Sequence, residues 1–427
     1  MTGLRGRRRF GGLLWQRDFR LLWIGETTSG LGSIVSEVAI PLLAVLVLHT
    51  NAFGVGVLSA VGWLPWLVVG LPAGTWVDRL PRRPVLITAD LVTAVALASV
   101  PIAAWCHVLT MSQLLGATLM TGVARVFFTT AYRAYLPSLV TKPNLAEGNA
   151  KLQGSEAFAA VAGPGLAGAI SQGLGVVTGL LLDAVSSMVS AVCLLSIHTR
   201  ETPRPPADPT STLRAETAAG LRLVLHDPFL RTLAVFGAAS NLALNMAQAI
   251  LVLFLIKVVG VNAAGVGTVL AVMSLGGLAG AAVANRLGRR FGTARALLAA
   301  ELGATPFGLL IAFASHGAGV LLAVFGGFVL IGGIVVSNVL QGGFRQAYCP
   351  QDLLGRITAS TQFVNYGAIP VGALLGGVLG DTIGLRPTIV VATIGCILAG
   401  SLLLIGPIRT NRDLPTEMPT AISVPIA

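Results

Sequence analysis

The sequence predicts an all-α integral membrane protein, and two observations lead to this fold class. Of the 427 residues, 54% are hydrophobic and only 11% are charged, so a soluble fold would lack the polar residues that its surface requires. The apolar residues also form continuous runs of about 20 residues, the length that an α-helix needs to span a bilayer. A transmembrane β-barrel would show short alternating segments instead.

Twelve such apolar runs follow one another along the chain, and each is expected to form a transmembrane helix. Their approximate limits are 19–48, 54–77, 84–105, 109–132, 152–172, 176–197, 229–257, 264–286, 294–315, 318–345, 357–380 and 385–408. The 52 glycines fit this expectation, because small residues allow helices in lipid to approach one another closely.

The Lys and Arg residues lie mostly in alternate loops, which predicts the orientation of the chain in the membrane. The loop after the second run carries Arg79, Arg82 and Arg83, whereas the opposite loops hold little beyond Lys257 and Arg386. The positive-inside rule then places both termini in the cytoplasm of a multi-pass protein of the cell (plasma or inner) membrane. It also accounts for the net charge of +11 without binding to nucleic acid.

A proline-rich stretch divides the chain into two halves. We expect a cytoplasmic tail at 1–18, a six-helix bundle at 19–198, a cytoplasmic linker at 199–228, a second six-helix bundle at 229–408 and a cytoplasmic tail at 409–427. The basic tail at 1–18 lacks a short apolar core with a cleavage site, so it is not expected to be a removed signal peptide. Within the linker, Leu213–His226 is predicted to form a short amphipathic helix at the membrane surface.

The two halves repeat one another at a dense charge cluster. The segment Gly74–Arg83 is similar to Ala281–Arg290, and aligning Asp78 with Asn285 gives an offset of 207 residues, about half the chain. This repeat predicts two pseudo-symmetric six-helix bundles. Secondary transporters of this architecture bind substrate at the interface between the repeats.

The charge cluster resembles the signature loop between the second and third helices of the major facilitator superfamily (MFS). The pattern is Gly74-x3-Asp78-Arg79-x-x-Arg82-Arg83, with Pro81 where the family prefers glycine. The resemblance covers essentially the whole chain and implies a conformational latch at these five residues, which would hold the two halves together on the cytoplasmic side. A plain topology signal would explain the arginines but not the spacing of glycine and acid.

The fifth run is similar to a helix-bend motif that is associated with drug/proton antiporters. It contains Gly163, Pro164 and Gly168, although Ala159 and Ala167 stand where the motif prefers glycine. The flanking sequences resemble the twelve-helix exporter branch of the superfamily, which includes enterobactin and macrolide exporters. A bent and tightly packed helix would limit ion leak, while ordinary helix packing explains much of the same pattern.

The first run carries a polar stripe at helical spacing, with Glu26, Gly30, Ser33 and Glu37 on one face. Acids in a spanning helix are costly in lipid, so the stripe should face an internal cavity. The two glutamates are about 16 Å apart along the helix axis, and we predict that at least one of them couples transport to protons. A hydrogen-bonded core residue or an interfacial ion pair is the alternative.

Arg125 lies deep in the fourth run, where a lone charge needs a partner. Its position resembles that of the superfamily's fourth-helix arginine, which is linked to proton transfer, and we expect it to pair with Glu26 or Glu37. A purely structural ion pair remains the alternative. Asp90 and Glu301 occupy similar places in the two halves and are expected to be structural partners of the arginine clusters.

The second half contributes neutral polar residues that could line a substrate cavity together with Ser33. They share helix faces or neighbouring helices, and are Asn241, Asn245, Gln248, Gln341, Gln362 and Asn365. Hydrogen bonding between helices without substrate contact is the alternative for each.

The sequence as a whole predicts a secondary active transporter, an exporter of small amphipathic organic molecules such as drugs, antibiotics or siderophores in exchange for protons. No Walker-type phosphate loop, nucleophile motif or metal-ligand spacing is present, so we expect no enzyme activity, no metal and no cofactor beyond the proton as coupling ion. The expected partners are a small-molecule substrate and membrane lipid, and the expected state is a monomer. Alternatives are an MFS importer, a facilitator, a lipid flippase, and a transport-dead membrane receptor or assembly protein.

Overall fold

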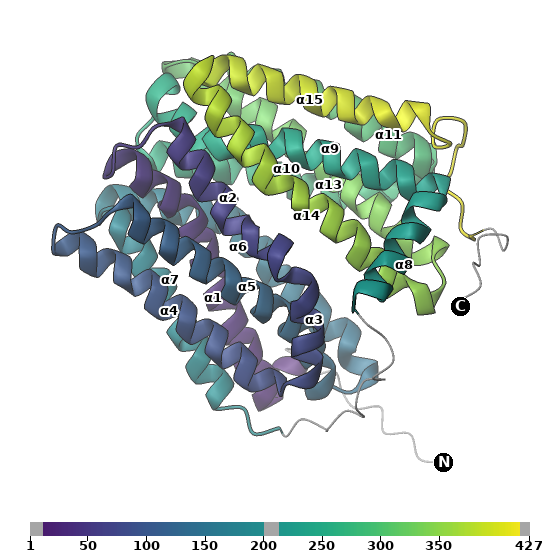
Figure 1. Cartoon of the computed structure of the whole chain (residues 1–427), viewed down its shortest axis with the longest axis horizontal. Helices are drawn as coiled ribbons and strands as arrows, with labels where there is room; N and C mark the ends of the chain where they lie inside the picture. The colour runs from purple at the N-terminus through teal and green to yellow at the C-terminus, as the bar shows by residue number, and fades with distance from the viewer. Residues whose placement is uncertain (1–11, 200–212, 419–427) are drawn as a thin grey trace.

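The computed structural model describes residues 12–199 and 213–418, and its regular elements are all helical in these ranges. Figure 1 shows two groups of helices side by side, one formed by the first range and one by the second. We call them the N-terminal and C-terminal halves. Most of the predicted tail at 1–18, part of the linker at 199–228 and part of the tail at 409–427 lie outside the described residues.

The helices of the N-terminal half are α1 (Arg17–Leu46), α2 (Ala52–Val68), α3 (Gly70–Arg79), α4 (Arg82–Trp105), α5 (Met111–Leu139), α6 (Leu145–Gly173) and α7 (Val176–Leu195). Those of the C-terminal half are α8 (Leu213–His226), α9 (Pro228–Phe254), α10 (Ala263–Phe291), α11 (Thr293–Ala304), α12 (Gly308–Ala312), α13 (Val320–Tyr348), α14 (Gln351–Thr382) and α15 (Leu385–Ile405). Short 3-10 turns and one π turn at Leu255–Val259 join or extend them. Helix α8 covers the residues for which the sequence predicts a linker helix.

In the described residues, ten helical segments are long and apolar enough to cross a membrane. Two of the twelve expected spans do not meet this standard. The one at 54–77 is divided into α2 and α3, yet the Val69 N–H still donates to the Pro65 carbonyl (2.8 Å) and the Ala73 N–H to the Val69 carbonyl (2.8 Å). The other, at 152–172, lies in α6, which is long enough but rich in glycine, alanine and polar residues.

Local sequence explains where several helices begin and turn. Asn51 and Asn262 cap α2 and α10, each accepting the backbone N–H three residues on, as N-cap residues do. Gly175 and Gly384 have φ of +90° and +93° between α6 and α7 and between α14 and α15. Only glycine adopts this backbone conformation without strain, so these two residues allow the tight reversals.

Within each half the helices pack in corresponding pairs. In the N-terminal half α1 contacts α6 and α7, and α2 contacts α5; in the C-terminal half α9 contacts α14 and α15, and α10 contacts α13. The two halves meet mainly where α2 packs against α14 and where α6 packs against α10. Both junctions are backbone contacts: a Cβ on Gly56 would lie 2.8 Å from Gly377 Cα, and one on Gly168 would lie 2.8 Å from Gly267 Cα.

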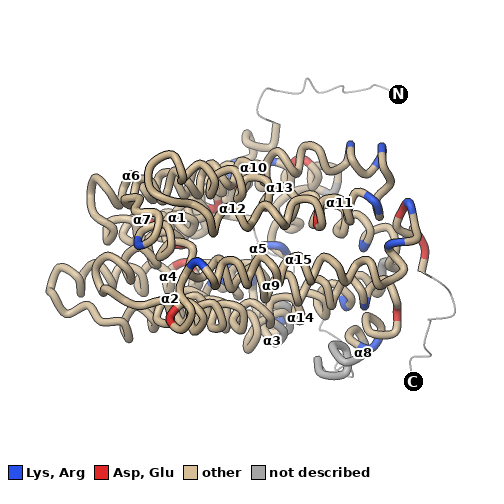
Figure 2. The backbone as a smooth tube through the Cα atoms, turned by 90° about the horizontal axis from the view of Figure 1, so that it is seen from above, with Lys and Arg blue, Asp and Glu red and all other residues tan. Residues whose placement is uncertain are grey.

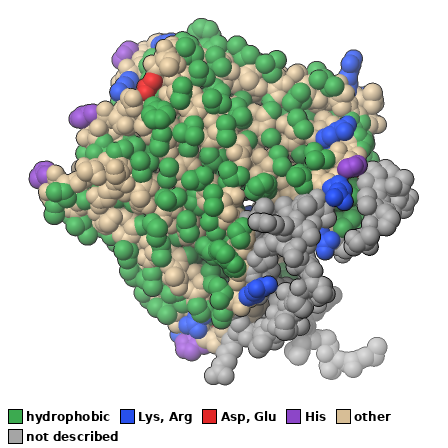
Figure 3. Space-filling model, viewed as in Figure 1, with side chains coloured by type: hydrophobic (Ala, Val, Ile, Leu, Met, Phe, Trp, Pro, Cys, Tyr) green, Lys and Arg blue, Asp and Glu red, His purple; other side chains and the backbone are tan. Residues whose placement is uncertain are grey.

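The outer surface is apolar, as a lipid-facing surface should be. Hydrophobic side chains are spread across the described face in Figure 3, with few charged side chains between them, and Val95, Leu174 and Ile405 expose 69%, 70% and 82% of their surface. Figure 2 shows basic residues gathered toward the end from which the C-terminal trace leaves. We call this end, where the described ranges begin and end, the terminal end, and the other, with the α1–α2 and α14–α15 loops, the loop end.

Candidate functional site in the N-terminal half

An ion pair between α1 and α5 is the centre of the candidate site. Arg125, in the middle of α5, donates from Nη1 to Oε1 of Glu37 on α1. The side chains of Arg125 and Glu37 are 50% and 47% exposed, although both lie well inside their spans. Two charges in lipid would be strongly unfavourable, so we assign this exposure to a water-accessible space inside the bundle.

The rest of the α1 stripe supports that assignment. A Cβ built on Gly30 would meet no atom within 4 Å, and Ser33 is half-buried on the same face. The residues predicted from helical spacing therefore line open space together with Glu37. On the opposite side of α1, a Cβ on Gly32 would lie 2.8 Å from the carboxylate Oδ1 of Asp183 on α7.

Asp183 completes the surroundings of the ion pair. It is 2% exposed, accepts a hydrogen bond from the Ser186 hydroxyl (3.4 Å), and lies within electrostatic range of Arg125 and Glu37. The sequence shows an acid in an apolar span, which signals a functional residue, but only the packing of α7 against α1 places it behind the pair.

Glu26 occupies a separate, more enclosed place. In the described structure Arg125 pairs with Glu37 and not with Glu26. The Glu26 Oε2 atom is buried without a hydrogen-bond partner, and the side chain is within electrostatic range of Asp90 and Glu156. The interior of the N-terminal half is therefore rich in carboxyl groups.

The expectation that Asp90 and Glu301 pair with the arginine clusters is wrong. Both are buried, with 3% and 5% exposure, and neither forms a salt bridge in the described residues. The regular repeat suggested the pairing, but each carboxyl points into its own helix bundle instead of toward the loop.

The predicted latch lies at the end of α3 and the start of α4. Arg82 donates to the Ala134 carbonyl of α5 (2.9 Å), and Arg83 donates to the Leu194 and Leu195 carbonyls of α7 (2.8 and 2.7 Å). These bonds join helix ends within the N-terminal half. A Cβ on Gly74 would meet no atom within 4 Å, Arg79 is exposed, and the side chain of Asp78 lies outside the described part.

The helix-bend motif lies at a junction between the halves. A Cβ on Gly163 would lie 2.4 Å from Ile34 of α1, and Gly168 packs against Gly267 of α10. On the other side of the same contact, a Cβ on Gly267 would lie 2.4 Å from the Pro164 carbonyl. Larger side chains cannot fit here, so this motif serves close packing between α6 and its neighbours.

Several polar residues predicted to line a cavity in the C-terminal half bond within their own helices. Asn241 and Asn245 donate to carbonyls of their own helix (2.9 Å each), and buried Gln341 donates to the Ser337 hydroxyl (2.9 Å). Gln362 is half-buried on α14, and Asn365 packs against Gly237, with its Oδ1 buried and unpartnered.

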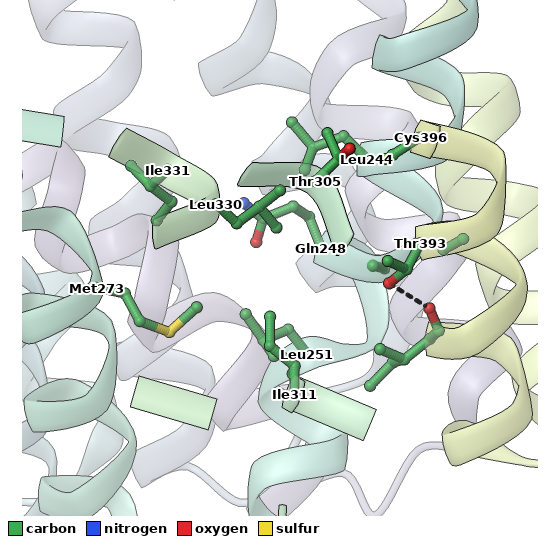
Figure 4. Close-up of a pocket in the computed structure, with 13 residues that line it drawn as sticks. Leu244, Gln248, Leu251, Met273, Thr305, Ile311, Leu330, Ile331, Thr393 and Cys396 are labelled. Carbon is green, nitrogen blue, oxygen red and sulfur yellow. Dashed lines mark hydrogen bonds between the residues drawn. The ribbon is translucent and has the colours of Figure 1, made fainter. Parts of the chain in front are cut away.

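Gln248 points into a small pocket inside the C-terminal half (Figure 4). The pocket is otherwise lined mostly by apolar side chains such as Leu244, Met273 and Ile331, and its Thr393 hydroxyl donates to the Ile389 carbonyl (2.8 Å). Its volume of about 40 Å³ is far below the 300 Å³ or more of typical small-molecule sites. This pocket is therefore too small for a drug-sized substrate.

An aromatic contact between the halves was not foreseen from the sequence. Trp63 and Trp66 of α2 lie 5.8 and 5.4 Å, centroid to centroid, from the ring of Tyr366 on α14, and Gly367 is against Leu67. The two tryptophans three residues apart indicate one helix face, but their partner is 300 residues away in the sequence.

Among the described residues no group of His, Cys, Asp and Glu could hold a metal ion.

The fold and site define the class of the protein. A family model of the Major Facilitator Superfamily matches residues 22–373, so the chain belongs to this superfamily and is a membrane transport protein. The exporter resemblance is confirmed by similar proteins. Multidrug efflux pump Tap of Mycolicibacterium fortuitum is 27% identical over 406 residues, covering 93% of this chain and 97% of Tap. Enterobactin exporter EntS of Salmonella typhimurium is 26% identical over 409 residues, covering 93% and 94%.

Solved structures show the same fold at low identity. A bacterial homologue of the iron transporter ferroportin, in an inward-facing state, matches with a TM-score of 0.72 and 16% identity, covering 91% of this chain and 98% of that one. The nucleoside transporter NupG matches with a TM-score of 0.66 and 12% identity, covering 91% and 98%. These matches concern the fold alone.

Proposed function

We propose that this protein exports small amphipathic organic molecules in exchange for protons, by alternating access between its two halves. The proposal includes twelve membrane crossings in two pseudo-symmetric bundles, a place in the cell membrane with both termini in the cytoplasm, and a monomeric state. Full-length similarity to an efflux pump and an enterobactin exporter supports the direction of transport.

The observation that carries proton coupling is the half-exposed ion pair between Glu37 and Arg125. Protonation of Glu37 removes its charge and breaks the pair. Arg125 then has Asp183 on α7 and Glu26 on α1 as the remaining carboxyl groups within electrostatic range, so its side chain moves away from Glu37 toward them. A proton taken up from the cavity thus changes the contacts between α1, α5 and α7, which is the differential interaction that a coupled transition requires.

The contacts between the halves support alternating access. They are concentrated where α2 meets α14 and α6 meets α10, and they consist of narrow glycine-to-glycine crossings. Such crossings form hinges and sliding surfaces with little side-chain interlock. The aromatic rings of Trp63, Trp66 and Tyr366 at the same interface are suited to the apolar part of an amphipathic substrate.

The test is transport by the purified protein in proteoliposomes. A panel of amphipathic dyes and antibiotics is first screened for compounds that raise the melting temperature. Uptake of the best compound is then measured into vesicles with an acidic lumen, with and without a protonophore. The proposal predicts uptake that depends on the pH gradient; gradient-independent equilibration indicates a facilitator, and absence of any flux indicates a receptor or assembly protein.

A further inference from the structure

A carboxylate of one half is bound to the start of a helix of the other half at the loop end. Asp381, in the last turn of α14, accepts the Ala52 N–H at Oδ1 (2.9 Å) and the Phe53 N–H at Oδ2 (3.1 Å). The Asn51 side chain also donates from Nδ2 to Oδ2 of Asp381 (2.6 Å). Three hydrogen bonds to one ionisable group therefore join segments about 330 residues apart.

These bonds complete the hydrogen bonding at the start of α2. The first N–H groups of a helix have no partner within the helix. At α2 the Ala52 and Phe53 N–H groups donate to the Asp381 carboxylate, and the Gly54 N–H donates to Asn51 Oδ1 (3.0 Å). The first regular helical bond runs from the Val55 N–H to the Asn51 carbonyl (3.3 Å). Two of these four N–H groups are therefore capped by a residue of the C-terminal half.

The surrounding backbone holds the carboxylate in place. A Cβ on Gly377, one turn before Asp381, would lie 2.9 Å from the Ala52 carbonyl, and one on Gly380 would lie 2.7 Å from the Ala52 Cβ. The two helices therefore touch through backbone at this end. Asp381 itself is exposed, so water can replace its partners when the helices separate.

The opposite end of the same segment is built differently. There a Cβ on Gly74 of α3 would meet nothing within 4 Å, and the hydrogen bonds of Arg82 and Arg83 given above stay within the N-terminal half. In this conformation the hydrogen bonds of Asp381 join the halves at the loop end through a charged group, whereas the hydrogen bonds given above for Arg82 and Arg83 at the terminal end stay within one half.

We infer that Asp381 is a latch that stabilises the conformation closed at the loop end, and that its bonds to α2 break each time that end opens. A carboxylate at a helix start is favoured by the partial positive charge there, and hydrogen bonds to charged groups are stronger than neutral ones. The latch biases a conformational equilibrium, so it does not depend on the direction of transport or on the coupling ion.

The test compares Asp381→Asn with a matched control, Asp413→Asn. Asp413 also accepts the first N–H of a helix, that of Thr293 at 2.8 Å, but it lies at the terminal end and within the C-terminal half. Spin labels are placed on exposed residues of both halves, at Val108 and Ile383 for the loop end and at Thr141 and Thr410 for the terminal end. The background has its four cysteines replaced by serine and is checked for an unchanged melting temperature.

Distance distributions between the spin labels are then measured by double electron–electron resonance spectroscopy in lipid nanodiscs without substrate. Asp381→Asn is expected to shift the population toward longer Val108–Ile383 distances by about tenfold, the factor expected from one charge-assisted hydrogen bond, with Asp413→Asn unchanged. Asn51→Asp keeps the N-cap acceptor but places a second carboxylate beside Asp381, and it should shift the population in the same direction.

An unchanged distribution in Asp381→Asn would overturn the latch, and so would equal shifts in Asp381→Asn and Asp413→Asn, which would indicate general loosening. A failure of proton-coupled export in proteoliposomes would leave these distances unaffected, so the two proposals fail separately.

Discussion

The interiors of the two halves differ in charge although their helices pack in corresponding pairs. In the N-terminal half the described interior holds Glu26, Glu37 and Asp183 around Arg125, with Asp90 close to Glu26 and Asp183. In the C-terminal half the described buried carboxyls are Glu301 and Asp227; Asp227 caps the start of α9 and accepts the Tyr348 hydroxyl, and the pocket beside Gln248 is mostly apolar. Similarly packed halves therefore differ in what their interiors offer: we propose that the N-terminal half handles ions and that the C-terminal half provides packing and apolar contact.

The largest expected effect comes from removing the charge of Glu37. Glu37→Gln keeps the side-chain shape but leaves Arg125 without its ion-pair partner and removes the group that we propose takes up the proton. Because the ion pair is half exposed, water screens it, and losing it has a smaller effect than losing a fully buried pair. We still expect the rate of gradient-driven transport to fall by about tenfold or more. Initial uptake rates in proteoliposomes measure this.

The matched control is Glu301→Gln, which neutralises a buried carboxyl inside the helices of the other half. It should change the coupled rate by less than about twofold, and its main cost should be in melting temperature. Equal loss of transport in Glu37→Gln and Glu301→Gln would break the proposed difference between the halves.

The second prediction concerns the repeated charge cluster. Asp78→Asn should lower transport by about fivefold or more, in the range of typical conformational couplings, because the resemblance assigns the latch to the first copy. Asn285→Asp introduces an acid into the second copy of the charge cluster and should change the transport rate little. Both are measured as initial transport rates at equal amounts of reconstituted protein, and equal sensitivity of the two positions would contradict the asymmetry.

Substitutions of the arginines in that cluster test whether its hydrogen bonds stabilise the fold. Arg83 donates to two carbonyls at the end of α7, so Arg83→Ala should lower the free energy of unfolding by about 1–3 kcal/mol. Arg79→Ala removes an exposed arginine of the same cluster and should cost much less. Thermal unfolding in detergent compares the two, and an equal loss of stability would contradict a capping role for Arg83.

The smallest effect on transport is expected from substituting Gln341. Its side chain is buried and bonded to Ser337 of the same helix, so Gln341→Met should leave KM and the coupled rate within about twofold, with stability changed by about 1 kcal/mol. A large increase in KM would instead place Gln341 in the substrate site, and the C-terminal half would then contribute more than apolar contact.

The membrane class, helix ranges and α1 stripe could be predicted because hydrophobic length and a 3.6-residue period are local properties of the sequence. Helix α8 begins and ends at the predicted residues Leu213 and His226 for the same reason. The division of 54–77 near Pro65 was less predictable, because proline inside a span can bend a helix or break it.

The partners of individual side chains could not be read from the chain. The sequence left Glu26 and Glu37 as equal candidates for Arg125, and the choice depends on how α5 is rotated against α1. Asp381 and Tyr366 were missed because their partners, Ala52 and Trp66, lie about 300 residues away in the other half. Such pairings are decided by tertiary packing, which no local pattern encodes.

Proton release from the purified protein on substrate binding tests most directly whether the Glu37–Arg125 pair couples transport to protons. In weakly buffered detergent solution with a pH indicator, addition of the compound that most raises the melting temperature should release protons from the wild type and from Glu301→Gln. It should release none from Glu37→Gln. Undiminished release from Glu37→Gln would contradict the assignment of proton coupling to the Glu37–Arg125 pair.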